Sequence, residues 1–359
     1  MCKNTNNETS INIKSIVTMK NLILLAAAAF AATACSDHDE WQNKPDANII
    51  TFGTTVQVET KAAVSGTNIP DGEKVGIYAL THAATPAWAS SNEMDNIEAT
   101  SNGAGGLDYS PLKEYTADNI YNFYAYYPYT AATEGENDGI KAPKASVAPT
   151  LKVTLAKTPD AQADYMYAVP IEKYKRTAAE SGNTQKLVFK HALTQVRFKF
   201  KNTETANAVS IVSLKITDKD KGTMSITDGT WSSLSATGGE GGNTFTLYAP
   251  AAITEVAAGS SFDIPLQLML FPKTGNDMTT NTDSGLTFKL ALKNSSNTDE
   301  TVTITPKVPA TGLEAGKSYL YTLLYNSESK DYVTLSTEVV DWVNATGGDL
   351  PATPDAGGE

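Results

Sequence analysis

The chain has 359 residues, with 28 Lys and Arg against 40 Asp and Glu, so its formal net charge is −12. A negative charge of this size argues against a nucleic-acid-binding protein and against a protein that binds membranes through a basic surface, since both need a positively charged face. Two cysteines and three histidines are too few for a disulfide framework or a His-based metal centre, so we expect neither a metal site nor a cofactor.

The N-terminal region, residues 1–34, has the features of a secretory signal. Residues 1–18 are polar and aperiodic, and Met19 begins a Met-Lys start followed by a 13-residue apolar run, 22–34. A membrane-spanning helix needs about 20 apolar residues, so this run predicts a cleaved signal peptide. We interpret Met19 as the true start and residues 1–18 as an upstream extension.

The small residues directly before Cys35 resemble a lipobox, which predicts that Cys35 carries a lipid. Ordinary signal cleavage, with an incidental cysteine, is the alternative. An acidic tether, 35–47, follows. Its first part resembles the surface-export signal of lipoproteins from gut and oral Gram-negative anaerobes, and we therefore expect an outer-membrane protein displayed at the cell surface. The export-signal residues are Ser36, Asp37, Asp39 and Glu40.

From residue 48 onward the sequence alternates apolar and polar residues in short segments, which is typical of half-buried strands. The first segment places Ile50, Phe52, Thr54, Val56 and Val58 on one face. No long amphipathic helix stands out, and Gly- and Asn-rich turns separate the segments, so we predict an all-β protein built of β-sandwiches. Further predicted strands lie near 75–79, 120–127, 151–155, 187–191, 196–200, 212–216, 245–247, 262–270, 286–292, 302–304, 319–325 and 333–339.

Three interruptions of this pattern predict local structure. The apolar parity shifts between His191 and Val196, which indicates a turn or bulge at 192–195. Pro265 falls inside a strand pattern and indicates an edge strand or a bulge. The polar stretch 176–185 is the best boundary between domains. We therefore predict an N-terminal β-sandwich, 48–184, a C-terminal β-sandwich, 185–346, and a flexible tail, 347–359.

The sequence contains no GxSxG, Walker, HExxH or CxxC motif, so we predict no catalytic residue and no enzyme activity. A glycoside hydrolase remains an alternative, because any two of the 40 acidic residues could form the pair of carboxylates that this reaction needs. We interpret His191 as a satisfied, partly buried core histidine. Trp88 and the tyrosines of 121–129 are interpreted as packing residues, with stacking on sugars as the alternative.

Several stretches, in this order, resemble the fimbrillin family of pilus subunit lipoproteins from Gram-negative anaerobes. Their order and spacing cover nearly the whole chain after the signal. They are the signal with Ile50-Thr51-Phe52 and Glu59-Thr60-Lys61-Ala62-Ala63, then Gly76-Ile77-Tyr78, then Tyr124-Ala125-Tyr126-Tyr127-Pro128-Tyr129, then Phe189-Lys190-His191-Ala192-Leu193 with Val196-Arg197-Phe198, and finally Ala315-Gly316-Lys317-Ser318-Tyr319 with a last strand reaching Trp342.

This resemblance implies two transthyretin-like β-sandwich domains in tandem, no enzyme activity, and a lipid-anchored precursor at the cell surface. In polymerising members of the family a trypsin-like protease cuts after the first strand, and a strand from a neighbouring subunit takes its place by β-augmentation. Here the removed strand would be about 49–60, and the cut would fall between Lys61 and Ala62, where the family usually has Arg. The donor strand, 332–342, would use Val333, Leu335, Val339 and Trp342.

The resemblance therefore predicts a fimbrial structural subunit that supports adhesion. An anchor or tip subunit that keeps its first strand is an alternative, as is a surface glycan-binding lipoprotein. A permanent place for the last strand in the second sandwich is the alternative to its donor role. The expected partners are other fimbrial subunits, the outer membrane through the lipid, a trypsin-like processing protease, and host or bacterial surface glycans or proteins.

Overall fold

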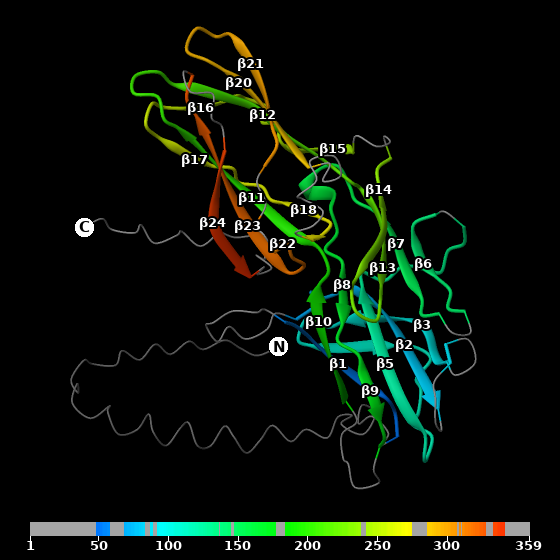
Figure 1. The fold of residues 1–359 in the computed structure, drawn as a ribbon. Coiled ribbons are helices and arrows are strands. Elements are labelled where there is room, and N and C mark those ends of the chain that lie inside the picture. Colours follow the sequence, from blue (N-terminus) through cyan, green and yellow to red (C-terminus); the bar gives the residue numbers. More distant parts are fainter. Residues whose placement is uncertain are drawn as a thin grey trace, which may run out of the picture. The chain divides into compact units, whose positions relative to one another are not determined.

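The computed structural model describes residues 48–57, 68–82, 87–88, 92–135, 137–144, 147–176, 184–237, 242–274, 286–306, 309, 311–327 and, as backbone, 333–341. In these ranges the chain forms 24 strands and one short 3₁₀ turn, η1, Pro159–Ala161 (Figure 1). The prediction of an all-β protein is confirmed. In this part of the chain no helix has the length and apolar character needed to cross a membrane.

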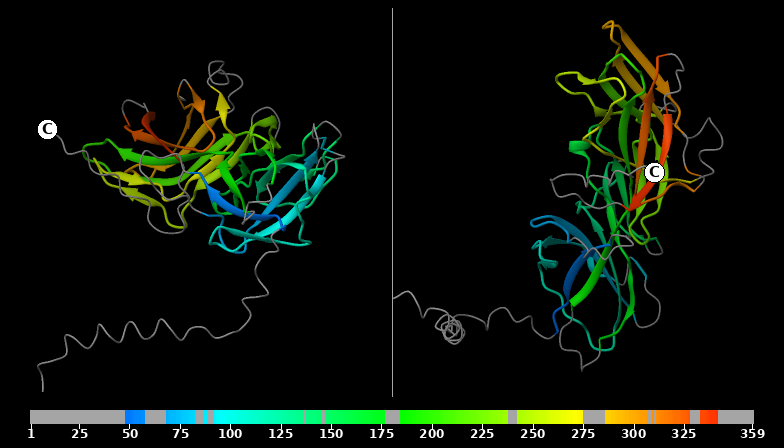
Figure 2. Two further views of the ribbon diagram at one scale, coloured as in Figure 1. Left: turned by 90° about the horizontal axis from the view of Figure 1, so that it is seen from below. Right: turned by 90° about the vertical axis from the view of Figure 1, so that its left-hand side faces the viewer.

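Seven strands of the first sheet close into a hydrogen-bonded ring, and an eighth is attached outside it. The ring closes because the second strand of the chain pairs with the third on one side and with the fifth on the other. The order around the ring is β2 (Lys74–His82), β3 (Asn92–Ser101), β4 (Gly106–Tyr109), β1 (Thr51–Val56), β10 (Thr184–His191), β8 (Met166–Ala168) and β5 (Ile120–Tyr127), while β9 (Ile171–Tyr174) pairs with β5. Figure 2 gives two further views of these strands.

The ring encloses the first hydrophobic core, and the alternation of the sequence explains which residues enter it. Ile50, directly before β1, and Phe52 and Val56 of β1 are buried there, as predicted, together with Ile77 of β2 and Phe123 of β5. Burying such side chains stabilises the fold by roughly 1.5–3 kcal/mol each. In β1 and β10 the inward face therefore follows the period-two pattern of the sequence.

The outer faces of β2 and β5 belong to a second hydrophobic core, so both of these strands are apolar on both sides. Tyr78 and Tyr124 lie in this second core. Trp88 packs against both, with ring centroids 6.0 Å from Tyr78 and 4.8 Å from Tyr124. Trp88 and these tyrosines therefore serve in packing, as interpreted from the sequence.

Two five-stranded sheets supply most of the second core. In the first, β11 is parallel to β23, and the order is β17 (Ser261–Asp263), β11 (Thr194–Asn202), β23 (Lys317–Tyr325) and β24 (Val333–Asp341), with β18 (Leu268–Leu270) also on β11. In the second the order is β15 (Asn243–Tyr248), β12 (Val209–Asp218), β20 (Thr287–Lys293) and β21 (Asp299–Ile304), with β16 (Thr254–Val256) on β12.

A four-stranded sheet combines strands that are far apart in the sequence. Its order is β14 (Trp231–Ser235), β13 (Lys221–Ser225), β7 (Thr150–Thr154) and β6 (Gly139–Lys141). The hairpin β6–β7 thus joins two strands from beyond residue 220. The smallest sheet pairs β19 (Lys273–Thr274) with β22 (Gly312–Leu313).

The chain passes from the first core to the second between β10 and β11. Phe189 is buried in the first core and Val196 in the second, with β10 ending at His191 and β11 beginning at Thr194. The predicted interruption at 192–195 is therefore confirmed. The strand Thr184–His191, which the predicted boundary assigned to the C-terminal sandwich, pairs with β1 and β8. The division into two domains stays a prediction.

The interruption predicted at Pro265 is also confirmed. β17 and β18 both pair with β11, but four residues separate them where only two residues of β11 lie between the paired positions. The extra residues form an irregularity at Pro265. It lies on a strand pair that borders β11 on the side away from β23.

Candidate functional site

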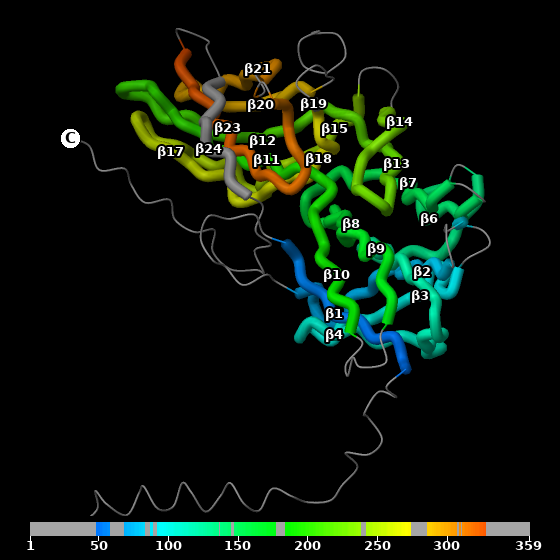
Figure 3. The backbone as a smooth tube through the Cα atoms, turned by 60° about the horizontal axis from the view of Figure 1, so that its bottom comes forward, coloured from blue at the N-terminus to red at the C-terminus, as the bar shows by residue number. Residues whose placement is uncertain are grey.

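The backbone of β1 pairs with a strand on each side, β10 and β4, and Figure 3 shows the course of these strands. It runs parallel to β10, from Thr51 opposite Thr184 to Val56 opposite Phe189, without a register shift. On its other side it is antiparallel to β4. The bonds Thr54 N to Gly105 O and Gln57 N to Phe189 O, both 2.7 Å, extend the pairing beyond the regular ladder. Loss of β1 would leave two neighbouring strand edges without their partner.

The inward face of β1 fills an apolar groove between those two edges. Ile50, Phe52, Thr54 and Val56 are all at most 5% exposed. The ring of Phe52 packs edge-on against that of Phe123, with centroids 5.5 Å apart. A strand that replaced β1 would therefore need apolar residues at every second position.

The last strand described, β24, lies at the edge of its sheet and pairs with β23 alone among the strands described (Figure 1). Three of its residues, Val333, Leu335 and Val339, stand opposite residues of β23. The pairing is irregular in the middle, because Tyr319 to Tyr321 spans two positions of β23 while Val339 to Leu335 spans four of β24.

Several residues proposed from the sequence lie outside the described residues, so what was inferred for them stays a prediction. This holds for the lipid-attachment residue, the export signal, the proposed cleavage position and the last residue of the proposed donor strand. They are Cys35, Ser36, Asp37, Asp39, Glu40, Lys61, Ala62 and Trp342.

His191 has the environment expected of a core histidine. It is 4% exposed, and its Nδ1 lies 2.8 Å from Oδ2 of Asp164. Among the described residues no group of three or more His, Cys, Asp or Glu side chains could hold a metal ion.

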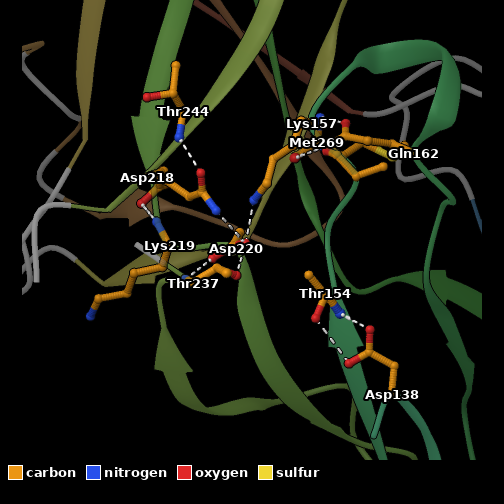
Figure 4. Close-up of polar contacts among 12 residues, drawn as sticks. Asp138, Thr154, Lys157, Gln162, Asp218, Lys219, Asp220, Thr237, Thr244 and Met269 are labelled. Carbon is orange, nitrogen blue, oxygen red and sulfur yellow. Dashed lines mark hydrogen bonds and ion pairs between the residues drawn. The ribbon is translucent and has the colours of Figure 1, made fainter. Parts of the chain in front are cut away.

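Sequence reasoning missed a group of buried charges at the end of β12 (Figure 4). Asp220 is fully buried and accepts hydrogen bonds from Lys157, from both the backbone N–H and hydroxyl of Thr237, and from Asn243. Burial alone would raise the pKa of Asp220, but these donors outweigh it and hold the pKa below its usual value. Asp220 therefore serves as a structural acceptor.

Asp218 is a second buried carboxylate, and its Oδ1 lies 2.6 Å from Nζ of Lys273, which is also buried. Burial raises the pKa of Asp218, partly offset by Lys273. Because Lys273 lies on β19 and Asp218 on β12, this buried ion pair is suited to holding the two strands together. No local motif in the sequence signals either group, since the partners come from distant segments.

The chain belongs to the fimbrillin-like family, whose model matches residues 60–342. A fimbrial protein from Bacteroides vulgatus ATCC 8482 has a similar fold, with a TM-score of 0.58 and 20% identity over 82% of this chain and 100% of that chain. A putative cell adhesion protein from Bacteroides ovatus ATCC 8483 has a TM-score of 0.52 and 15% identity over 83% of this chain and 99% of that chain. A sequence search among curated proteins gives no match.

Family membership confirms the resemblance noted in the sequence and defines a class of protein. Fimbrillin-like proteins are structural, which implies a non-enzymatic protein. The family also supports a role as a fimbrial subunit that associates with other subunits at the cell surface.

Proposed function

We propose that this protein is a fimbrial structural subunit that assembles by strand exchange and supports adhesion. Its precursor is anchored in the outer membrane by a lipid on Cys35 and exported through the acidic signal Ser36–Glu40. A trypsin-like protease cuts between Lys61 and Ala62, β1 leaves, and β24 of a neighbouring subunit enters the vacated groove. The role is non-enzymatic, and the partners are further copies or related subunits.

One observation carries the proposal: β24 repeats the pattern of β1. The buried face of β1, with the residue directly before it, reads Ile50, Phe52, Thr54, Val56. Beginning at Val333, every second residue of β24 reads Val333, Leu335, Thr337, Val339. Each position thus keeps its chemical class when the two strands are aligned in the same direction. In the opposite direction Thr337 would replace Phe52 and Leu335 would replace Thr54, which the apolar groove fits poorly.

The two strands also differ in a way that favours exchange. Among the strands described, β24 is bonded along one edge only and is irregular between Leu335 and Val339, whereas the β1 position offers two edges and a regular register. A regular strand in that position would form more backbone hydrogen bonds than β24 forms within its own sheet. Each additional bond contributes roughly 0.5–1.5 kcal/mol.

Two alternative functions would leave different features in the molecule. An anchor or tip subunit would keep β1 and would not form a homopolymer. A glycan-binding lipoprotein would need exposed aromatic rings, but Trp88 packs against Tyr78 and Tyr124, so no observation favours that role at Trp88.

Electrophoresis of material sheared from the cell surface tests the proposal. We expect a ladder of multimers that resists SDS at room temperature and collapses to a monomer on heating, because exchanged strands dissociate slowly. Monomer at both temperatures would contradict assembly by strand exchange and favour the anchor or tip role.

A further inference from the structure

A cavity of about 590 Å³ opens beside the C-terminal end of β1. This volume lies within the range of small-ligand sites, roughly 300–1,000 Å³. Its lining is mainly apolar and includes two aromatic residues, while Gln57 marks the place where the chain leaves β1. The lining residues that matter here are Gln57, Tyr167, Trp231, Leu234, Pro272 and Leu313.

The wall of the cavity is held in place by the fold. Trp231 donates from Nε1 to the backbone oxygen of Ala192 over 2.7 Å, and its ring packs against Phe271 with centroids 4.7 Å apart. The backbone N–H of Gly316 donates to Leu193 O over 2.8 Å. These contacts keep the cavity formed before anything occupies it.

The alignment of β24 with β1 predicts which residues of a donor strand reach this cavity. If Val333 takes the position of Ile50, then Val340 takes that of Gln57 and Trp342 follows two residues later. Because side chains alternate along a strand, Val340 and Trp342 share the face on which Gln57 lines the cavity. Trp342 lies two residues beyond, which is roughly 7 Å along the strand.

The donor and the resident strand present different chemistry to the cavity. At this place the resident strand offers the polar residue Gln57, whereas the donor offers Val340 and, two residues further on, Trp342. A tryptophan buries more apolar surface than any other side chain, and its ring packs well against Tyr167 and Trp231. The apolar part of the cavity, which includes Tyr167, Trp231 and Leu313, therefore interacts more favourably with the donor residues than with Gln57, which is the condition for a shift toward exchange.

We infer that this cavity is the anchor pocket for Trp342 of a second copy of the chain. The inference rests on the proposed strand exchange and adds a specific receptor site to it. Trp342 enters next to Trp231 after the donor strand has paired along β10, and it fixes both the direction and the register of the donor.

Cysteine cross-linking in surface fimbriae tests this placement. Trp342→Cys is combined with Thr311→Cys or, separately, with Thr230→Cys, because both threonines line the cavity and are exposed. After heating in SDS without reductant, we expect covalent multimers from both pairs, since a disulfide requires close approach of the two residues. The control pair, Trp342→Cys with Thr303→Cys on β21, should give heat-dissociated monomers.

Two further variants separate the pocket from the strand exchange. Trp342→Ala should raise the rate at which heated multimers dissociate by about tenfold or more, as for a truncated interface anchor, while Trp342→Phe should retain most of the stability. Ala315→Trp, which fills the cavity from its exposed rim, should act like Trp342→Ala, and Thr303→Trp should have no effect.

The results of these experiments test the anchor pocket and strand exchange separately. Wild-type ladders that are unchanged by Trp342→Ala and Ala315→Trp, with no cross-link, would overturn the anchor pocket and leave strand exchange intact. A disulfide formed within one monomer would show that residue 342 lies in the cavity of its own chain. This result would also overturn the inference. The absence of any wild-type ladder would overturn both.

Discussion

Tyr126 lies directly across Gly76. The two residues are paired between β5 and β2, and a Cβ added to Gly76 would stand 2.2 Å from Cε1 of the tyrosine ring. The ring cannot easily move, because its hydroxyl donates to Asn96 Oδ1 over 2.7 Å and accepts from the N–H of Thr130 over 3.2 Å. Gly76 and Tyr126 belong to two of the sequence stretches that resemble the fimbrillin family, so these two stretches contact each other in the fold.

We therefore expect Gly76→Ala to destabilise the protein by roughly 1–3 kcal/mol, the usual cost of overpacking a core. The measurement is the free energy of urea unfolding of the full chain. In a Tyr126→Ala background the same substitution should cost much less, because the ring is gone. An equal cost in both backgrounds would show that the contact is not the cause.

Phe52→Ala should affect the precursor and the assembled fimbria differently. In the precursor it removes a buried ring that packs against Phe123 and should cost roughly 3–5 kcal/mol of unfolding free energy. Thr55→Ala, on the other face of the strand, is the matched control and should cost within about 0.5 kcal/mol. The assembled material has lost β1, so its heat resistance should not change. A parallel loss of heat resistance would mean that β1 remains in the fimbria.

The direction of the donor strand can be tested by placing charge on one face of β24. Leu335→Asp puts a carboxylate at the position of Phe52 and should abolish the ladder, because burying an unpaired charge in an apolar groove is strongly unfavourable. Thr334→Asp, at the half-buried position of Thr51, should leave the ladder in place. Thermal unfolding of both monomers shows whether the fold survives. Equal loss of assembly in both folded variants would argue against this register.

The pH dependence of stability should report the buried Asp220. Its pKa in the folded protein lies below the usual 3.8, so its charge stabilises the fold above that value and the stabilisation is lost as the pH falls through both pKa values. Asp220→Asn should lower the unfolding free energy at about pH 7 by roughly 1–3 kcal/mol and reduce its fall on acidification to about pH 3.

Asp299→Asn is the control for this experiment, because the Asp299 side chain is 80% exposed and forms a surface ion pair with Lys293. It should leave the pH profile as in the wild type. An acid profile of Asp220→Asn that matches the wild type would show that Asp220 does not carry the effect.

Local patterns predicted the strands of this fold well but not their partners. The alternation from Ile50 to Val56 predicted the buried face of β1, and the parity shift after His191 predicted the break between β10 and β11. Nothing local indicates that β2 and β5 close a ring, because closure depends on register between distant segments. The same holds for the hairpin β6–β7, which joins β13, and for Asp220, whose donors include Lys157 and Asn243.

The candidate site likewise has one part that the sequence predicts and one part that it does not. The pattern shared by β1 and β24 is present in the sequence, and it predicts that one strand can replace the other. The cavity beside Gln57 could not be predicted, because its wall combines residues from several distant strands and loops. A cavity built from distant segments can be identified only in the folded chain.

The N-terminal sequence of the protein in assembled surface fimbriae tests the account most directly. We expect a start at Ala62, because the segment that contains β1 is removed before a neighbouring β24 can enter its groove. Polymerised material that begins at a lipidated Cys35, with β1 still present, would contradict strand exchange at this site.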